Sequence, residues 1–152
     1  SVGHGNYTSA AVNFDAASLN LARKAMRNQK DLTGEHFAGA VPRFLIVGPE
    51  QESAAEALMA TLYPATVANV NTSPDLTILV EPRITDNAAM IFASPTSAPV
   101  LWVSYLAEAP GPQFAQEDDF DTLGVKFRVV LDFATHANDY RGAYRFDDVS
   151  GA

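Results

Sequence analysis

The sequence predicts an α+β fold with a mixed or antiparallel sheet. Three observations favour this class: a length of 152 residues with 47% apolar and 18% charged residues, helical periodicity in the first half, and strand-sized apolar segments in the second. A chain of this length builds one core rather than two. We therefore expect a flexible arm over residues 1–14 and a single unit over 15–152, with two early helices and about six later strands.

The first helix is expected over residues 16–30. Asp15 is a suitable N-cap, and Leu19, Ala22 and Met26 recur at helical spacing. The rest of its surface is the one basic patch of the sequence, where a solvated face is a better interpretation than a docking site for an acidic neighbour. The basic residues are Arg23, Lys24, Arg27 and Lys30.

A short strand over residues 43–47 and a second helix come next. Gly48-Pro49 ends the strand, and proline suits the first helical position because its missing N–H loses no hydrogen bond there. Glu50 and Glu52 follow where the helix dipole favours negative charge. The apolar face of this helix consists of Ala54, Ala55, Leu58, Met59 and Leu62. Residues 65–74 are expected to connect with little structure of their own.

The second half reads as strands and turns. The most explicit segment is residues 125–133, where apolar residues alternate with Lys126, Arg128, Val130 and Asp132, which predicts a long half-buried strand. Residues 134–139 are expected to form a short connection, and residues 140–146 a last strand. Further extended segments are expected over residues 76–80, 88–93, 100–106 and 113–116.

Charge and composition restrict the class of partner. The formal net charge is −8, and 11 of the 18 acidic residues follow Thr77, so the surface repels phosphate backbones and nucleic acid is a poor partner. Cysteine is absent, which excludes disulfides and thiolate chemistry and fits a reducing compartment. No apolar run reaches the roughly 20 residues that a bilayer requires. The start at Ser1 without a leader indicates a processed or excised piece.

No recognisable catalytic or metal motif is present. The candidate bases His4, His36 and His136 occur in no catalytic frame, and their spacing suits no metal site. The acidic run 117–121 is the best cation candidate, but a solvated acidic loop is the better interpretation. The segment Val47-Gly48-Pro49 lacks the lysine and the serine or threonine hydroxyl of a phosphate-binding loop. We predict no catalytic, cofactor-binding or metal-binding residues.

The order of short motifs along the chain carries a resemblance to a known family. The earlier motifs are His4-Gly5-Asn6, Leu21-Ala22-Arg23-Lys24-Ala25-Met26, Gln29-Lys30 and Pro42-Arg43-Phe44-Leu45-Ile46-Val47. The later and more specific ones are Asn69-Val70-Asn71, Leu79-Val80-Glu81-Pro82-Arg83-Ile84, Gly111-Pro112-Gln113, Phe120-Asp121, Gly124-Val125, Leu131-Asp132-Phe133, Asp139-Tyr140-Arg141-Gly142 and Tyr144-Arg145. In this order they resemble the C-terminal part of tailed-phage major capsid proteins, especially those fused to a prohead protease.

The resemblance implies a major capsid fold of the Hong Kong phage type. It implies that the chain supplies mainly the axial domain, with residues 124–134 extending toward a peripheral domain whose other strands precede Ser1. The implied function is structural: a virion subunit that forms pentamers or hexamers and a shell with copies of itself, built in the cytoplasm of the bacterial host. It implies no reaction, cofactor, membrane, small-molecule substrate or specific nucleic-acid site. Two alternatives are a hydrolase-like enzyme whose groups meet only in space and a small partner-binding module.

Overall fold

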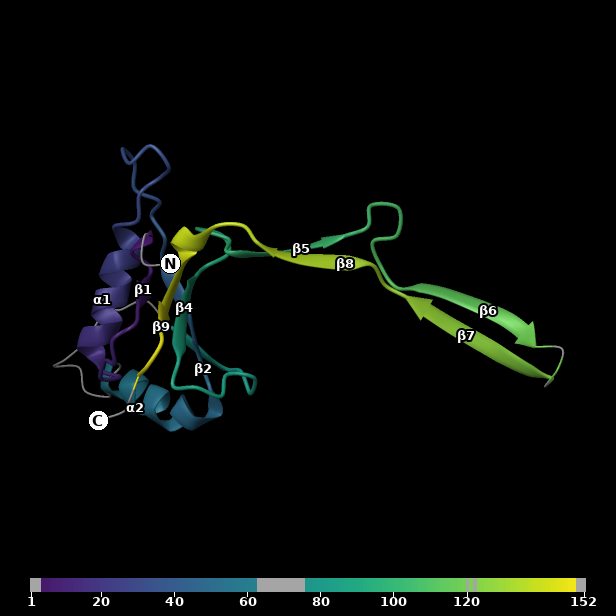
Figure 1. Cartoon of the computed structure of the whole chain (residues 1–152), viewed down its shortest axis with the longest axis horizontal. Helices are drawn as coiled ribbons and strands as arrows, with labels where there is room; N and C mark the ends of the chain where they lie inside the picture. The colour runs from purple at the N-terminus through teal and green to yellow at the C-terminus, as the bar shows by residue number, and fades with distance from the viewer. Residues whose placement is uncertain (1–3, 63–75, 120, 122, 150–152) are drawn as a thin grey trace. The chain divides into compact units, whose positions relative to one another are not determined.

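The computed structural model describes residues 4–62, 76–119, 121 and 123–149. They divide into two compact units, residues 1–100 with 139–152 (unit 1) and residues 101–138 (unit 2). Unit 1 contains a five-stranded mixed sheet and both α-helices (Figure 1). Unit 2 contains two separate two-stranded ladders. The α+β class is confirmed, and the predicted segment 65–74 lies outside the described residues.

The first helix is α1, Ala16–Arg27, and its local sequence specifies both ends. The Asp15 carboxylate accepts hydrogen bonds from the backbone N–H groups of Ala17 and Ser18, both at 2.9 Å, and the Ser18 side chain completes a capping box. Leu19, Ala22 and Met26 are buried, as their spacing predicts. The helix is shorter than expected because Asn28 caps it and the chain turns back, so that Lys30 forms a bridge with Phe37.

The sheet of unit 1 has the strand order β1-β9-β4-β2-β3. Among its central strands, β4 (Ala89–Ala93) is antiparallel to both of its neighbours, β2 (Pro42–Val47) and β9 (Ala143–Phe146). The edge strands are parallel to the strands they pair with: β1 (Tyr7–Thr8) to β9, and β3 (Thr77–Val80) to β2. Alternate residues of the central strands point into the core. The sheet is thus mixed, which is one of the two arrangements that the sequence predicts.

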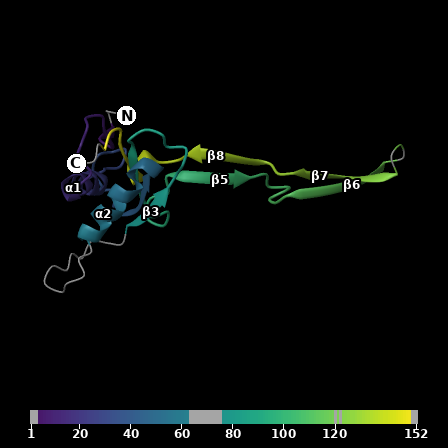
Figure 2. The same ribbon diagram turned by 90° about the horizontal axis from the view of Figure 1, so that it is seen from below.

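Both helices pack against this sheet (Figures 1 and 2). Helix α1 contacts β9, and α2, Glu52–Leu62, contacts β3 after a 3-10 turn, η2, over Pro49–Gln51. A second 3-10 turn, η4 (Tyr140–Gly142), leads into β9. The fully or nearly fully buried side chains form one core, which includes Leu19, Met26, Leu45, Val47, Ala55, Leu58, Ile91, Tyr144 and Phe146.

The first described residues belong to this unit. Tyr7 pairs with Arg145 and Thr8 with Phe146, and the Val12 N–H donates to the Asp148 carbonyl at 3.0 Å. A two-residue strand whose partner lies more than a hundred residues away leaves no periodic signal in the sequence. The division of the chain into an arm over 1–14 and one unit over 15–152 stays a prediction.

The strands of unit 2 depart from the expected boundaries. They are β5 (Leu101–Tyr105), β6 (Gln113–Asp119), β7 (Gly124–Val130) and β8 (Phe133–Ala137). The long strand expected over 125–133 is interrupted at Leu131 and Asp132, and residues 134–137, predicted as a connection, continue as a strand because they pair with β5. Strand β6 also runs through most of the acidic run, which was expected to be a loop.

Candidate interaction surfaces

The two ladders of unit 2 follow one another along the chain. Strand β5 pairs antiparallel with β8, from Leu101 opposite Ala137 to Tyr105 opposite Phe133. Strand β6 pairs antiparallel with β7, from Gln113 opposite Val130 to Asp119 opposite Gly124. The Leu106 N–H donates to the Asp132 carbonyl at 3.4 Å, where one ladder gives way to the next. Unit 2 is therefore a long hairpin with an excursion over residues 106–112.

The β6–β7 ladder has one apolar and one charged face, because directly opposed residues share a face and neighbours along a strand alternate. Phe114 lies opposite Val129 on the apolar face, which also carries Val125 and Phe127. The charged face carries Glu117, Asp119, Lys126 and Arg128. There the Lys126 ammonium lies 2.8 Å from an Asp119 carboxylate oxygen. We call the two surfaces the apolar face and the charged face.

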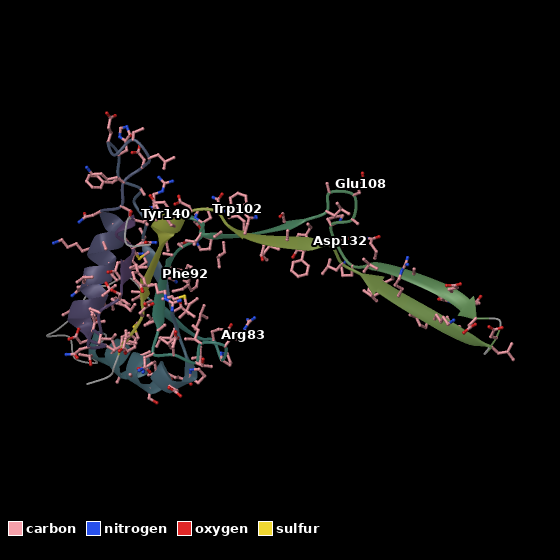
Figure 3. The ribbon with its side chains drawn as sticks, viewed as in Figure 1. Arg83, Phe92, Trp102, Glu108, Asp132 and Tyr140 are labelled. Atoms are coloured by element: carbon pink, nitrogen blue, oxygen red, sulfur yellow. The ribbon has the colours of Figure 1, made fainter. Side chains whose placement is uncertain are left out.

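The apolar face is open to solvent. The exposed fractions are 79% for Phe114 and 76% for Phe127, and every described residue of β7 is exposed. On β5 and β8 an equivalent row of exposed apolar side chains shares one face: Leu101, Val103, Tyr105 and Phe133. Trp102, labelled in Figure 3, lies on the other face, where its ring centroid is 6.3 Å from that of His136.

The prediction of a half-buried strand over 125–133 is thus wrong for the described chain, although the alternation behind it is real. Alternation indicates that a strand has two unlike faces but does not reveal what covers the apolar one. A two-stranded ladder with no covering layer is at best marginally stable in water. Contiguous exposed apolar side chains are typical of surfaces that bind another protein segment. The arrangement fits docking better than chemistry.

The three histidines of the sequence are not assembled into a catalytic group. The His4 ring stacks on Tyr140 with centroids 3.9 Å apart, His36 contributes its backbone to a turn, and His136 lies beside Trp102. Within the described part of the chain, no histidine side chain is hydrogen-bonded to a serine or a carboxylate. In the same residues, no group of three or more potential ligands is placed to hold a metal ion.

The acidic run 117–121 does not form a cation site among its described members. Glu117 and Asp119 lie on the charged face of the β6–β7 ladder, whereas Asp118 lies opposite Val125 on the other side. Consecutive residues of a strand point to opposite faces, so their carboxylates diverge. Asp119 is already engaged by Lys126.

A cluster of polar side chains, Tyr7, Asp86, Arg145 and Asp147, connects strands of unit 1. The Tyr7 hydroxyl donates to the Asp147 carboxylate, which also accepts from Arg145 Nε at 2.8 Å. The hydrogen bond from Tyr7, followed by that from Arg145, lowers the pKa of Asp147, and the pKa of Tyr7 is raised by the same bond. Arg145 also reaches Asp86 at 3.5 Å. Each charge has a structural partner, which ties β1 and the chain after β9 to the sheet.

A second such pair lies at η4. Arg141 binds the Asp139 carboxylate through its guanidinium, with a shortest distance of 2.7 Å, and this bond lowers the pKa of Asp139. Asp139 also accepts from the Arg141 backbone N–H at 2.9 Å, so it caps the turn. No helix of the described residues is long and apolar enough to span a bilayer.

Comparison with known proteins gives the arrangement its context. A family model described as phage capsid protein matches residues 1–146. The chain belongs to the phage capsid protein family. No curated protein sequence matches the chain.

Solved structures agree on the fold of this capsid-family chain. A phage-related protein from Bordetella bronchiseptica RB50 matches with a TM-score of 0.62 at 12% identity, over 95% of this chain and 54% of the other. The holo-SrpI encapsulin complex from Synechococcus elongatus PCC 7942 matches with a TM-score of 0.56 at 12% identity, over 99% of this chain and 55% of the other. The chain thus spans about half the length of these structures.

The family model confirms the resemblance to phage capsid proteins, and the solved structures agree with the Hong Kong phage-type fold. Membership of this family indicates a structural role in a capsid. The assignment to the axial domain stays a prediction. Sequence reasoning predicted that the apolar side of residues 125–133 is covered, but it did not identify Phe114 of β6 as part of the same face or foresee that the described chain leaves this face exposed. The signal was present in the alternation of residues 125–133, which demands a cover that the described chain does not provide.

Proposed function

We propose that this chain forms the axial domain, and one strand of the peripheral domain, of a phage-type capsid subunit that assembles with copies of itself. The subunits form rings of five or six and then a closed shell, which becomes the capsid of a virion or prophage-derived particle. Assembly takes place in the host cytoplasm. Membership of the phage capsid protein family supports assembly into a shell. The exposed apolar face of unit 2 supports the assignment of this part of the chain to the peripheral domain.

The apolar face is the observation that carries this proposal. Burying a phenylalanine stabilises by about 1.5–3 kcal/mol relative to leaving it in water, and Phe114 and Phe127 are both largely exposed. Residues 124–134 then enter the peripheral domain, where other segments of the same subunit cover them. The chain spans about half of the structures it matches, which leaves room for such segments.

The subunit performs no reaction in this proposal. The histidines serve stacking and turns, and the carboxylates with lowered pKa values are held by neighbouring arginine, tyrosine or threonine side chains. It requires no cofactor, small-molecule substrate or membrane. The net charge of −8 disfavours adhesion to packaged nucleic acid.

The test compares neighbouring residues on the two faces of β7. The intact capsid protein is produced with Phe127→Ser or with the control Arg128→Ser, and particles are counted by electron microscopy and sedimentation. Phe127→Ser removes an apolar side chain that is buried in every copy of the assembled subunit. The loss of about 1.5–3 kcal/mol of burial free energy per subunit lowers particle yield at least tenfold. Arg128→Ser alters the charged face and leaves the yield within about threefold, because exposed charges contribute little.

Equal yields from both variants, or an intact parent that forms no particles, would refute the proposal. The yield of folded protein is measured separately by circular dichroism. A Phe127→Ser subunit that keeps the far-ultraviolet spectrum of unit 1 but no longer forms particles supports it.

A further inference from the structure

The loop that follows α1, residues 28–38, is ordered by a single carboxylate. Asp31 Oδ1 accepts hydrogen bonds from the Thr33 hydroxyl at 2.7 Å, the Thr33 N–H at 3.1 Å and the Glu35 N–H at 3.2 Å. The Asp31 N–H donates to the His36 carbonyl at 2.9 Å, and the Ala38 N–H to the Gln29 carbonyl at 2.8 Å. The loop therefore holds its shape by its own hydrogen bonds although its side chains are almost all exposed.

This ordered loop displays apolar side chains with cations beside them. The exposed fractions of Leu32 and Phe37 are 91% and 65%, and the Lys30 ammonium lies 5.7 Å from the centre of the Phe37 ring. Lys24 and Arg27 are exposed in the last turn of α1, and in the described part of the chain neither makes an ion pair. We call Lys24, Arg27, Lys30, Leu32 and Phe37 the cationic end of unit 1.

The start of α2 has the opposite charge. Glu50, Glu52 and Glu56 are exposed, and among the described residues none of them pairs with a cation. Strand β3 adds apolar surface here, because Val80 pairs with Val47 just before the turn into α2, and Leu79 and Val80 are partly exposed. The cation in the following turn, Arg83, is already held by Glu81 at 2.7 and 3.0 Å. We call Glu50, Glu52, Glu56, Leu79 and Val80 the anionic end.

The two ends cannot neutralise each other within one copy. Figure 1 shows the end of α1 with its loop at the top of unit 1 and the start of α2 at the bottom. Each end combines exposed apolar side chains with charges of one sign that, as far as the described residues show, form no ion pair. Surfaces of this kind are complementary between copies when they meet head to tail, and repeated head-to-tail contacts close into a ring when the rotation allows it.

We propose that the cationic end of one copy docks on the anionic end of the next, and that this contact joins neighbouring subunits within a ring. The inference rests on the proposed function and assigns the surfaces that it uses. The Asp31 hydrogen bonds fix the loop before contact, so that little conformational entropy is lost when Leu32 and Phe37 are buried. Glu35, the other carboxylate of the loop, remains at its rim.

The test uses charge reversal on each end of the intact capsid protein. One variant carries Lys24→Glu with Arg27→Glu, a second carries Glu52→Lys with Glu56→Lys, and a third carries all four substitutions. In the first two variants both ends of unit 1 have the same sign, so like charges face each other at every contact and ring formation falls at least tenfold, roughly what juxtaposed like charges cost. The fourfold variant restores opposite signs and returns to within about threefold of the parent.

Mixing the two reversed variants sharpens the test. One has two acidic ends and the other two basic ends, so every contact in an alternating six-membered ring is complementary, and the mixture forms six-membered rings although neither variant does alone. The substitutions in the two variants change the net charge in opposite directions, so their shared defect does not come from net charge. Assembly is measured by analytical ultracentrifugation and electron microscopy, and folding by thermal unfolding of each variant.

Three results would overturn the inference. The first is unchanged assembly of both reversed variants. The second is a defect that neither the fourfold variant nor the mixture repairs. The third is loss of nucleic-acid binding by the Lys24→Glu and Arg27→Glu variant with assembly intact, which would make the cationic end a phosphate-binding surface. In all three cases the parent still forms particles, so the proposed function stands, whereas a parent that never assembles removes both.

Discussion

Units 1 and 2 use the same alternating strand pattern and reach opposite degrees of burial. In unit 1, Leu45, Val47 and Ile91 alternate along β2 and β4 and are completely buried, because two helices and neighbouring strands surround them. In unit 2, Val125, Phe127 and Val129 alternate just as regularly along β7 and are all exposed. The difference shows that an alternating pattern specifies which face of a strand is apolar, whereas burial of that face depends on other segments that pack against it.

The strongest test of this contrast truncates one phenylalanine in each unit. Phe146→Ala removes a side chain that is only 1% exposed and lowers the free energy of unfolding of unit 1 by about 3–5 kcal/mol. In the 152-residue chain alone, Phe127→Ala lowers the free energy of unfolding by less than about 0.5 kcal/mol, the usual effect of an exposed substitution. Urea unfolding followed by circular dichroism measures both. Equal losses would show that unit 2 is already part of the same cooperative core.

Two glycines extend the contrast to the backbone. A Cβ at Gly48 would lie 2.4 Å from the carbonyl oxygen of Ile84, whereas one at Gly111 has no atom within 4 Å. Gly48→Ala therefore forces the backbone apart and costs about 1–3 kcal/mol. Gly111→Ala stays within about 0.5 kcal/mol. Thermal unfolding of the two variants checks this, and a neutral Gly48→Ala would contradict the tight packing of the turn into α2.

A smaller effect is expected at the N-cap of α1. Asp15→Ala removes the acceptor of two 2.9 Å backbone hydrogen bonds and costs about 1 kcal/mol. Lys126→Ala, which removes the cross-strand partner of Asp119 on the charged face, costs roughly 0–1 kcal/mol. The same urea titration ranks the two variants. A larger loss from Lys126→Ala would indicate that the ladder of unit 2 contributes more to global stability than its exposure suggests.

The smallest effect is pH-dependent and belongs to unit 1. The lowered pKa of Asp147 means that its bonds to Tyr7 and Arg145 stabilise the folded state above the ordinary carboxylate pKa. That contribution is lost as the pH falls through about 4 toward the lowered folded value. The melting temperature of Asp147→Asn is therefore below that of the parent at pH 6, and the gap narrows by pH 3. A gap that widens on acidification would reverse the sign and refute the argument.

The sequence predicted correctly those helices and strands whose apolar faces are buried by other described residues. The helical spacing of Leu19, Ala22 and Met26 predicted α1, and Gly48-Pro49 predicted the end of β2 and the start of the second helix. It missed β1, because a two-residue strand is specified only by its distant partner β9. It placed residues 134–137 in a connection because their small and polar side chains lack apolar periodicity, and pairing with β5 overrides that preference.

The candidate surfaces were predictable in part. The basic patch on α1 and the acidic start of α2 are visible in the sequence as charges. Their positions at opposite ends of unit 1 depend on how the sheet orders its strands, which charge patterns do not encode. The exposure of Leu32 and Phe37 depends on the turn made by Asp31, whose hydrogen bonds are a matter of three-dimensional geometry.

Gly142 has a consequence for how this architecture tolerates change. A Cβ there would lie 2.6 Å from the carbonyl oxygen of Ala98. The backbone before β5, at Ala98, and the backbone after β8, at Gly142, therefore lie in close contact. The hairpin of residues 101–138 therefore leaves and re-enters unit 1 at one point, so a change in its length leaves the strand registers of the mixed sheet as they are.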